Sequence, residues 1–538
     1  MIGIDKIIAR FPGTRVEEGA ALPTLVAPPG EYRALAGFLR DDEGARFDYL
    51  ACMTGVDGGE WLGVVLLLES TTSGERVYLQ TGTTDRERPL LPTVSDLWET
   101  ANLNEREVYD YFGIRFAGHP DTRRLFLRND WVGYPLRKDY DADALVNPVR
   151  LESDETPDDT RSWREDGGEE AHALFDDEEY VVNIGPQHPA THGVLRFRVA
   201  LEGEIVKKVD VHCGYIHRGI EKMCESLTYP QMLPMTDRLD YLAAHQHRHA
   251  LCLCVEEALQ MEVPERVKYI RTIMDELNRL SSHLLFWSTL CMDLGALTAF
   301  FYGFRDREKV LDIMEETTGG RLIQHYNVIG GVTDDIHPNL ARRVKEFIKY
   351  LPPMLKEYDE VFTGNVIARE RMTGVGVLSR ADAISYGVTG PSGRASGWAC
   401  DVRKRRPYGV YDKVDFKEIV HEEGDSFHRY LTRVEEITES LRILEQLVDN
   451  VPPGEFAVKT KPVIKLPEGR YFKSVEGSRG EFGVYIESRG EKTPYRLKFR
   501  STSFPLVSVV PLLARGSKIA DLIAIGGTLD YIVPDVDR

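Results

Sequence analysis

The chain has 538 residues, of which 42% are hydrophobic and 28% charged, and its formal net charge is −19 at pH 7. A chain of this length exceeds a single hydrophobic core, so we expect two or more domains. The acidic balance argues against a nucleic-acid binder, and seven cysteines without a C-x-x-C pair argue against a closed zinc or iron–sulfur site and for a reducing compartment.

Residues 1–140 are predicted to form a mixed α/β domain. The runs GVVLLLES (63–70) and RVYLQTG (76–82) are typical of strands, and the turn sequence TTSGE separates them. They therefore predict a hairpin. The stretch 95–114 carries apolar residues at helical spacing and predicts one helix, with Trp98 on its inner face.

An acidic tract, 141–179, separates this domain from the rest of the chain. Residues 152–180 hold 13 acidic and two basic side chains. Such a composition is typical of a solvated tether, and we interpret the tract as a linker. An acidic arm that docks on another protein is the alternative.

Residues 180–538 are predicted to form a helical bundle flanked by two small β pieces, which places the whole chain in the α+β class. The pattern of 180–215 predicts strands, and 220–450 show mostly helical spacing, with Pro264 near the first turn of a long helix. Residues after 453 return to strand patterns. The most apolar runs, such as VSVVPLLA, fall short of the roughly 18–20 residues of a membrane-spanning helix. We expect no membrane span, although the chain can still sit on a membrane complex.

The stretch YLAAHQHRHALCLCVE (241–256) contains three histidines and two cysteines and suggests a metal site. Its surroundings predict a helix, on which residues two apart point in different directions. Only His245 and His249 could share a face. We therefore expect a wet or partner-facing helix edge here rather than a metal centre.

A Gly- and Pro-rich loop, GPQHPATHG, contains His188 and His192. Its prolines make a helical metal pair improbable, and irregular loops on rigid scaffolds often carry function. An imidazole with a pKa of about 6.5 suits proton donation near neutral pH, although the two side chains could equally be satisfied within the turn. Tyr241 is a second candidate, with a core position as its alternative. Asp293 follows a long apolar helix and needs a partner, which a histidine could provide.

Long motifs resemble the peripheral subunits of NADH–quinone oxidoreductase (respiratory complex I). Seven stretches resemble its D subunit: NIGPQHPATHGVLRF, GYIHRGIEK, TDRLDYLAAH, ELNRLSSHLLFW, DLGALTAFFYGFRDRE, TGPSGRASGWACDVRK and PDVDR. EREVYDYFGIRFAGHPDTRRLFL (105–127) resembles its C subunit. The resemblance covers most of the chain and implies a fused C/D subunit. It consists of an α/β domain like the C subunit (1–140), the acidic linker (141–179) and a domain like the D subunit (180–538).

The D subunit shares its fold with the large subunits of nickel–iron hydrogenases. Hydrogenases hold nickel with two C-x-x-C pairs, because nickel in that geometry needs soft thiolate ligands. The aligned positions carry Asp240 and Ala243 in one motif and Ile532 and Asp535 in the other. We therefore expect no metal site and no hydrogenase activity. A membrane-bound hydrogenase-type large subunit and a purely structural docking subunit are the alternatives to a quinone-reducing function.

In the family, a quinone headgroup enters the cavity that the metal has left. The resemblance implies that His192 and Tyr241 hydrogen-bond the two quinone carbonyls and that Asp293 pairs with His192. Both donors can stabilise a developing oxyanion and pass a proton. The resemblance assigns support of the site to three further residues: His188, Arg238 and Asp240.

Electrons are expected from an iron–sulfur cluster held by a partner, the B subunit. By resemblance, Arg218 and the adjacent His217 lie beside that cluster, where a cation stabilises its reduced form. The family often carries a histidine and an arginine at the positions of Ile323 and Val328, and His325 is displaced by two. This departure weakens proton-linked tuning of the cluster and suits a low-potential acceptor such as menaquinone.

The resemblance also implies the surroundings of the chain. The quinone, menaquinone or ubiquinone, is the substrate, and NAD and FMN would bind only other subunits. The expected partners are the B, I, H and A subunits, with the E, F and G subunits where present, and no nucleic acid. The expected location is the periphery of the bacterial inner (plasma) membrane, on its cytoplasmic side.

Overall fold

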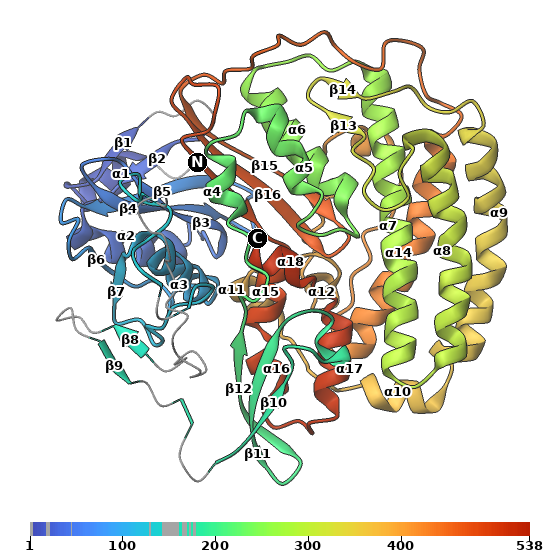
Figure 1. Cartoon of the computed structure of the whole chain (residues 1–538), viewed down its shortest axis with the longest axis horizontal. Coiled ribbons are helices and arrows are strands. Elements are labelled where there is room, and N and C mark those ends of the chain that lie inside the picture. Colours follow the sequence, from blue (N-terminus) through green and yellow to red (C-terminus); the bar gives the residue numbers. More distant parts are fainter. Residues whose placement is uncertain are drawn as a thin grey trace.

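The computed structural model has an α/β part on one side and a helical bundle on the other, with a small sheet between them (Figure 1). It describes residues 4–17, 22–44, 46–128, 131–141, 161–163, 169–171, 174–175 and 179–538. This is the predicted α+β architecture. The predicted boundaries at 140 and 179 stay a prediction, because most of the acidic linker lies outside the described residues.

A five-stranded sheet in the order β1-β2-β5-β4-β3 forms the N-terminal part. Its strands are β1 (Arg15–Glu17), β2 (Thr24–Val26), β3 (Tyr49–Asp57), β4 (Leu62–Glu69) and β5 (Arg76–Thr83). The other elements of this part are α1 (Ile4–Arg10), α2 (Pro29–Asp41), β6 (Leu90–Pro92), α3 (Thr100–Phe112) and β7 (Arg115–Ala117). The predicted hairpin is confirmed, since β4 and β5 pair antiparallel across the TTSGE turn.

The helix predicted over 95–114 is shorter in the structure. It begins at Thr100, because the preceding chain folds back onto it. The Glu105 carboxylate accepts a hydrogen bond from the backbone nitrogen of Val94 at 2.8 Å, which holds the segment as a turn. Trp98 is buried as predicted, and its indole nitrogen donates to the Phe47 carbonyl oxygen at 3.2 Å.

Two small β units follow the N-terminal part. β8 (Arg161–Trp163) and β9 (Glu169–Ala171) pair within the acidic tract. β10 (Tyr180–Ile184), β11 (Arg196–Glu202) and β12 (Ile205–His212) form an antiparallel sheet. β11 and β12 join at Gly203, whose φ of 62° suits a tight turn, and these strands confirm the strand pattern predicted for 180–215.

The bundle is built from long helices that pack side by side (Figure 1). They are α7 (Glu265–Asp293), α8 (Leu297–Thr318), α9 (Leu340–Tyr358) and α14 (Ser426–Leu447). Pro264 lies directly before α7, where its missing N–H leaves no hydrogen bond unmade. The shorter helices are α4 (Ile220–Cys224), α5 (Tyr229–Thr236), α6 (Ala244–Ala258), α10 (Val366–Met372), α11 (Arg380–Tyr386), α12 (Gly390–Arg394) and α13 (Val402–Arg405). Short irregular elements complete it: η1 (Pro189–Thr191), β13 (Asn327–Val328), β14 (Gly331–Val332), η2 (Asp359–Thr363) and η3 (Tyr411–Lys413).

The prediction of strands after residue 453 is confirmed for residues 469–500 and is wrong for the end of the chain. A three-stranded sheet is present, made of β15 (Gly469–Gly477), β16 (Gly480–Ser488) and β17 (Arg496–Arg500). The rest forms short helices: α15 (Ser503–Ser508), α16 (Val510–Ala514), α17 (Asp521–Leu529) and α18 (Val533–Asp537). Proline lies near the start of α16 and of α18, where it fits a helix but would interrupt a central strand.

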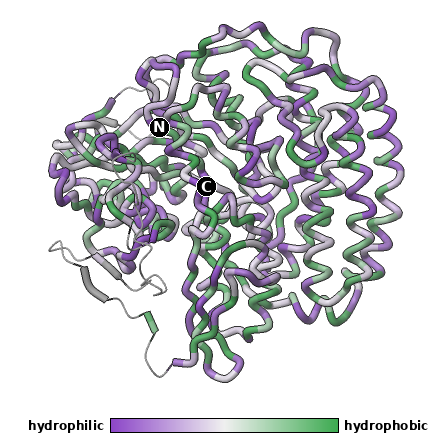
Figure 2. Tube along the Cα trace, viewed as in Figure 1, coloured by the Kyte–Doolittle hydropathy of each residue, from purple (hydrophilic) through white to green (hydrophobic). Residues whose placement is uncertain are grey.

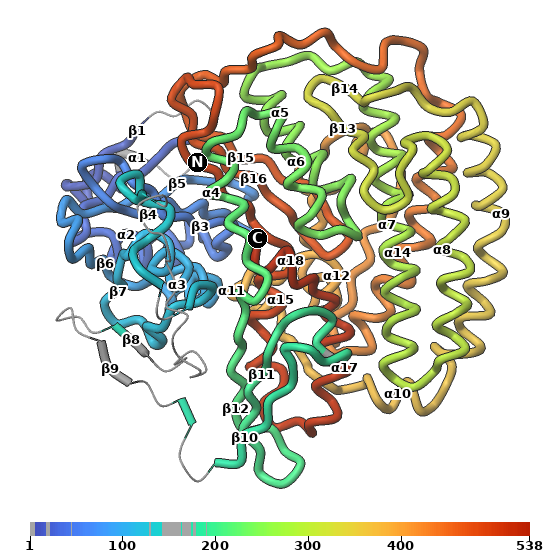
Figure 3. The backbone as a smooth tube through the Cα atoms, in the orientation of Figure 1, coloured from blue at the N-terminus to red at the C-terminus, as the bar shows by residue number. Residues whose placement is uncertain are grey.

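The N-terminal and C-terminal parts share buried contacts. Glu107 of α3 accepts hydrogen bonds from Lys498 of β17 and, at 3.0 Å, from Nη2 of Arg538. All three side chains are buried, so each charge depends on its partner. The C-terminus therefore lies near the middle of the molecule, between the two parts (Figure 3).

Hydropathy alternates along the bundle helices (Figure 2). This pattern fits helices that bury one face against their neighbours. Within the described residues, no helix combines the length and the apolar character that crossing a membrane requires.

Candidate functional site

The loop between β10 and β11 holds His192 in an unusual backbone conformation. Its φ is 51°, in the left-handed region that residues other than glycine rarely adopt. The buried Thr191 hydroxyl fixes the turn, because its oxygen lies 2.7 Å from the His188 carbonyl oxygen and 2.8 Å from that of Gly193, and its one hydrogen is shared between them. A Cβ on Gly193 would lie 2.5 Å from Val533 Cγ2, so only glycine lets the loop approach α18 this closely.

The His192 side chain faces the end of α7. Its Nε2 lies 2.6 Å from Oδ2 of Asp293, the last residue of that helix. α17 packs against η1 and α7 (Figure 1), and a Cβ on Gly527 of α17 would lie 3.3 Å from the same carboxylate oxygen. Burial opposes a charge on His192, but the hydrogen bond and the charge of Asp293 raise its pKa above the ordinary value. The histidine partner expected for Asp293 is thus present, and the pair favours a protonated imidazole.

Tyr241 lies in the turn between α5 and α6 and is 36% exposed. Burial of its ring and the charge of the adjacent Asp240 raise the pKa of its hydroxyl, which keeps it a proton donor at neutral pH. Asp240 itself is buried. Its carboxylate accepts hydrogen bonds from the backbone nitrogen of Leu242 at 2.9 Å and from Nη1 of Arg479 at 2.9 Å.

Arg479 and Asp530 form an ion pair whose charges act on both candidate donors. Nε of Arg479 donates to the Asp530 carbonyl oxygen at 2.7 Å, and Nη2 lies 3.2 Å from its carboxylate. The negative charge of Asp530 raises the pKa of both His192 and Tyr241, and the positive charge of Arg479 lowers both. The same two charges therefore act on both candidate donors.

The residues expected to support the site separate into two groups. Asp240 is adjacent to Tyr241 in the chain and is buried and bound by Arg479. Arg238 is instead exposed and donates to the Pro234 carbonyl oxygen at 2.9 Å. His188 has an exposed side chain, and its backbone carbonyl contributes to the His192 turn. Arg238 instead contacts Arg218: Nη2 of Arg218 donates to the backbone carbonyl oxygen of Arg238 at 2.8 Å.

His217 and Arg218 lie next to the C-terminus. Nδ1 of His217 lies 2.6 Å from the Asp537 carbonyl oxygen, and its ring stacks on Tyr111 of the N-terminal part. Arg218 is exposed. Partial burial and the neighbouring charge of Arg238 lower the pKa of its guanidinium. Two cationic side chains thus lie side by side at the surface.

The expectation of a wet or partner-facing edge at 241–256 is wrong. His245 and His249 are both buried, and the Nδ1 atom of each lies 2.7 Å from an oxygen of Asp275. The prediction that only these two histidines share a face is confirmed by their common partner. α6 packs against α7, and this buried carboxylate lies between them.

The positions aligned with the hydrogenase cysteines hold other chemistry. The Asp240 carboxylate is bound by Arg479, and Oδ2 of Asp535 accepts hydrogen bonds from the Ser501 and Thr502 hydroxyls at 2.7 and 2.9 Å. Ala243 and Ile532 offer no ligand atom. These residues do not fit a thiolate-bound nickel ion.

The segment that departs from the family pattern lies next to α6. Nδ1 of His325 lies 2.7 Å from Oδ2 of Asp237, and Arg248 donates to the same carboxylate oxygen at 2.8 Å. The imidazole of His325 is therefore bound to the Asp237 carboxylate, which also pairs with Arg248. Neither family position, Ile323 or Val328, carries a titratable side chain.

Comparison with known proteins gives concordant matches. The family model described as "Respiratory-chain NADH dehydrogenase, 49 Kd subunit" matches residues 293–464 and 459–538, and "Respiratory-chain NADH dehydrogenase, 30 Kd subunit" matches 25–145. The C/D subunit of NADH-quinone oxidoreductase from Phocaeicola vulgatus is 68% identical, over 92% of this chain and 96% of that protein. A C/D subunit from Aquifex aeolicus is 39% identical over 94% of each. The D subunit from Geobacillus kaustophilus is 45% identical, over 67% of this chain and 98% of that protein.

Proposed function

The chain belongs to the fused C/D subunits of NADH-quinone oxidoreductase, and we propose that it forms the quinone headgroup site of that enzyme. The observation that carries this proposal is the contact of 2.6 Å between His192 Nε2 and Asp293 Oδ2. Tyr241 supports it, because its side chain is partly exposed and the charges of Arg479 and Asp530 act on it as they do on His192. The pair supplies two proton donors at one site.

The chemistry of the site follows from these donors. Reduction of a quinone to a quinol takes up two electrons and two protons, and negative charge develops on each carbonyl oxygen. Tyr241 and His192 hydrogen-bond the two carbonyl oxygens and each delivers one proton. Asp293 stabilises the imidazolium before that transfer, and Arg479 holds Asp240, the neighbour of Tyr241, in place. His188 supports the site through its backbone carbonyl, which shapes the His192 turn and does not depend on the imidazole, and Arg238 by extending the cationic surface.

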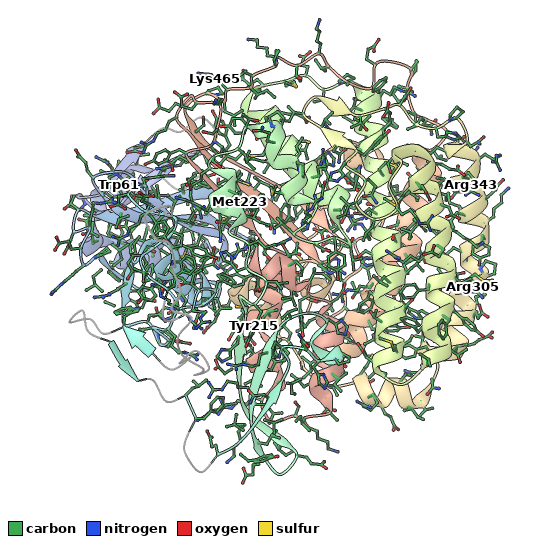
Figure 4. The ribbon with its side chains drawn as sticks, viewed as in Figure 1. Trp61, Tyr215, Met223, Arg305, Arg343 and Lys465 are labelled. Atoms are coloured by element: carbon green, nitrogen blue, oxygen red, sulfur yellow. The ribbon has the colours of Figure 1, made fainter. Side chains whose placement is uncertain are left out.

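Electrons enter from an iron–sulfur cluster of the B subunit. The B subunit docks on the surface around Arg218. This surface combines the adjacent cations Arg218 and Arg238 with exposed apolar side chains. Tyr215 is 46% and Met223 41% exposed, and both are labelled near the centre of Figure 4. Exposed aromatic and Met side chains beside Arg are the composition of a protein interface. The cations stabilise a reduced, more negative cluster.

We expect the potential of that cluster to vary little with pH. Neither Ile323 nor Val328 can take up a proton when the cluster is reduced, and this suits menaquinone. Redox titration of the assembled complex at pH 6 and pH 8 measures the dependence. A slope approaching about 59 mV per pH unit, that of a fully proton-coupled one-electron couple, would contradict the expectation. Loss of that slope in His325→Asn would assign it to the displaced histidine.

The end of the bundle next to Asp293 supports a position on a membrane complex. Exposed apolar side chains gather on the starts of α8 and α10: Leu297, Phe301, Val366 and Ile367. Such a surface fits burial against another protein. We assign it to the H subunit, on the cytoplasmic side of the bacterial inner membrane. The I and A subunits are further neighbours, and NAD and FMN belong to other subunits.

Replacement of His192 tests the site. We expect His192→Gln to lower quinone reductase activity about 10²-fold, because an amide cannot donate a proton at this position. His188→Gln is the matched control: it removes an exposed imidazole of the same loop and should change activity far less. Reduction of an artificial acceptor upstream of the quinone reports assembly and electron entry. Equal losses in both variants, or no loss in His192→Gln, would contradict the proposal.

A further inference from the structure

A second cluster of metal-ligating side chains lies outside the quinone site, in the segment HEEGDSFH that leads into α14. Ligand atoms of His421, Glu423 and His428 all lie within 4.8 Å of one another. We infer that these three residues bind a divalent transition-metal ion of the Zn²⁺ class. Two imidazoles and one carboxylate are a common ligand set for zinc, and they leave a fourth position for water or a partner's side chain.

The His428 imidazole is oriented for this role. Its Nδ1 lies 2.7 Å from Oδ1 of Asp425, while its Nε2 lies 3.4 Å from Oε2 of Glu423. Histidines that ligate metals commonly donate their other ring nitrogen to a carboxylate, which fixes the tautomer and the direction of the ring. Asp425 is buried, and it also accepts from the backbone nitrogen of Gly374 at 2.7 Å. The ring is thus held with Nε2 toward Glu423.

The backbone that carries the cluster is fixed by neighbouring segments. The backbone nitrogen of His421 donates to the Arg394 carbonyl oxygen at 3.0 Å, and the backbone nitrogen of Gly424 donates to the Ala395 carbonyl oxygen at 2.8 Å. The Leu378 nitrogen in turn donates to the Gly424 carbonyl oxygen at 2.9 Å. Two other parts of the chain therefore hold the ligand segment in place before any ion binds, which lowers the entropy lost on binding.

The charge around the cluster favours a cation. Oε2 of Glu435 lies 3.2 Å from Nε2 of His421 and adds a second carboxylate. Among the ion pairs of the described residues, neither Glu423 nor Glu435 pairs with a Lys or Arg side chain. Imidazole nitrogen together with carboxylate selects Zn²⁺ over Mg²⁺, which prefers oxygen ligands and retains its waters.

The cluster lies at the same end of the bundle as Asp293. α14 runs antiparallel to α7, since the Trp287 indole nitrogen near the end of α7 donates to the Tyr430 hydroxyl near the start of α14 at 3.1 Å. A metal ion at His421 and His428 would cross-link the incoming segment to the first turn of α14. It is separate from the quinone site, so its test does not depend on quinone chemistry.

Titration of the full purified chain with Zn²⁺ against a chelating indicator tests the inference. We expect His421→Gln and His428→Gln each to remove one equivalent of bound Zn²⁺ or to weaken it at least tenfold. Glu422→Gln is the matched control, because it removes an adjacent exposed carboxylate that is not part of the cluster. Excess Mg²⁺ should not displace the ion, and X-ray absorption should report imidazole nitrogen in its coordination shell.

Two outcomes would overturn the metal site. One is unchanged Zn²⁺ stoichiometry and affinity in both histidine variants. The other is an equal loss in Glu422→Gln, which would indicate general attraction by the acidic surface. Thermal unfolding without zinc reports whether each variant is folded. If a histidine variant does not fold, Glu423→Gln, which changes one exposed side chain of the cluster, takes its place in the test.

Discussion

Tyr241→Phe should lower quinone reductase activity about 10²- to 10³-fold, the range for loss of one preorganised donor to a developing oxyanion. The substitution removes a single hydroxyl and keeps the ring. Asp240, bound to Arg479 and to two backbone nitrogens, should hold the turn unchanged. In the proposed function electrons enter at the surface around Arg218, which this substitution leaves unchanged, so we expect the clusters still to be reduced. Steady-state quinone reduction by the assembled complex, with the cluster signal followed in parallel, measures both.

The control for this substitution is Tyr180→Phe, which removes the hydroxyl of an exposed tyrosine on β10. It should leave both measurements unchanged. If turnover of Tyr241→Phe is also unchanged while the clusters are reduced, the quinone binds elsewhere. The chain would then act as a scaffold for its partner subunits rather than as part of the active site.

Local patterns in the sequence predicted the long elements well. Burial leaves a direct mark on the sequence of these elements. It appears as apolar runs in β4 and β5 and as helical spacing of apolar residues in α7. The same reasoning failed for residues 503–537. The prediction extended the strand pattern to the end of the chain, but the structure buries this segment as short helices, and prolines near the starts of α16 and α18 favour that outcome.

Only part of the candidate site could be predicted from the sequence. His192, Tyr241 and Asp293 stand in recognisable motifs, whereas Arg479 and Asp530, whose charges act on both donors, were missed. Arg479 lies 239 residues from Asp240 along the chain, and a turn between two strands gives no sign of a buried ion pair. The same limit explains the error at His245 and His249. Their partner Asp275 lies on another helix, so the sequence shows polar residues without showing what satisfies them.

Asp293→Asn should remove the charge that favours protonated His192 and leave the shape of the site unchanged. Burial and the nearby Arg479 then act against the imidazolium, so the pKa of His192 should fall. A proton-donating His192 loses activity as pH rises through its pKa. The alkaline limb of the activity profile should therefore move to lower pH, with a loss of about tenfold at pH 6 and about 10²-fold at pH 8.

The stability of the folded chain gives an independent measure of the same pair. Because the folded pKa of His192 is raised, the pair stabilises the native state fully below the unfolded pKa of about 6.5 and loses that contribution as pH rises through the folded value. Asp293→Asn should thus destabilise the chain more at pH 5.5 than at pH 8.5, whereas its activity loss grows in the opposite direction. Asp334→Asn, at an exposed loop carboxylate, is the control for both measurements. Parallel losses of stability and activity across pH would mean that Asp293 only holds the fold, and His192 would then lose its role as the proton donor.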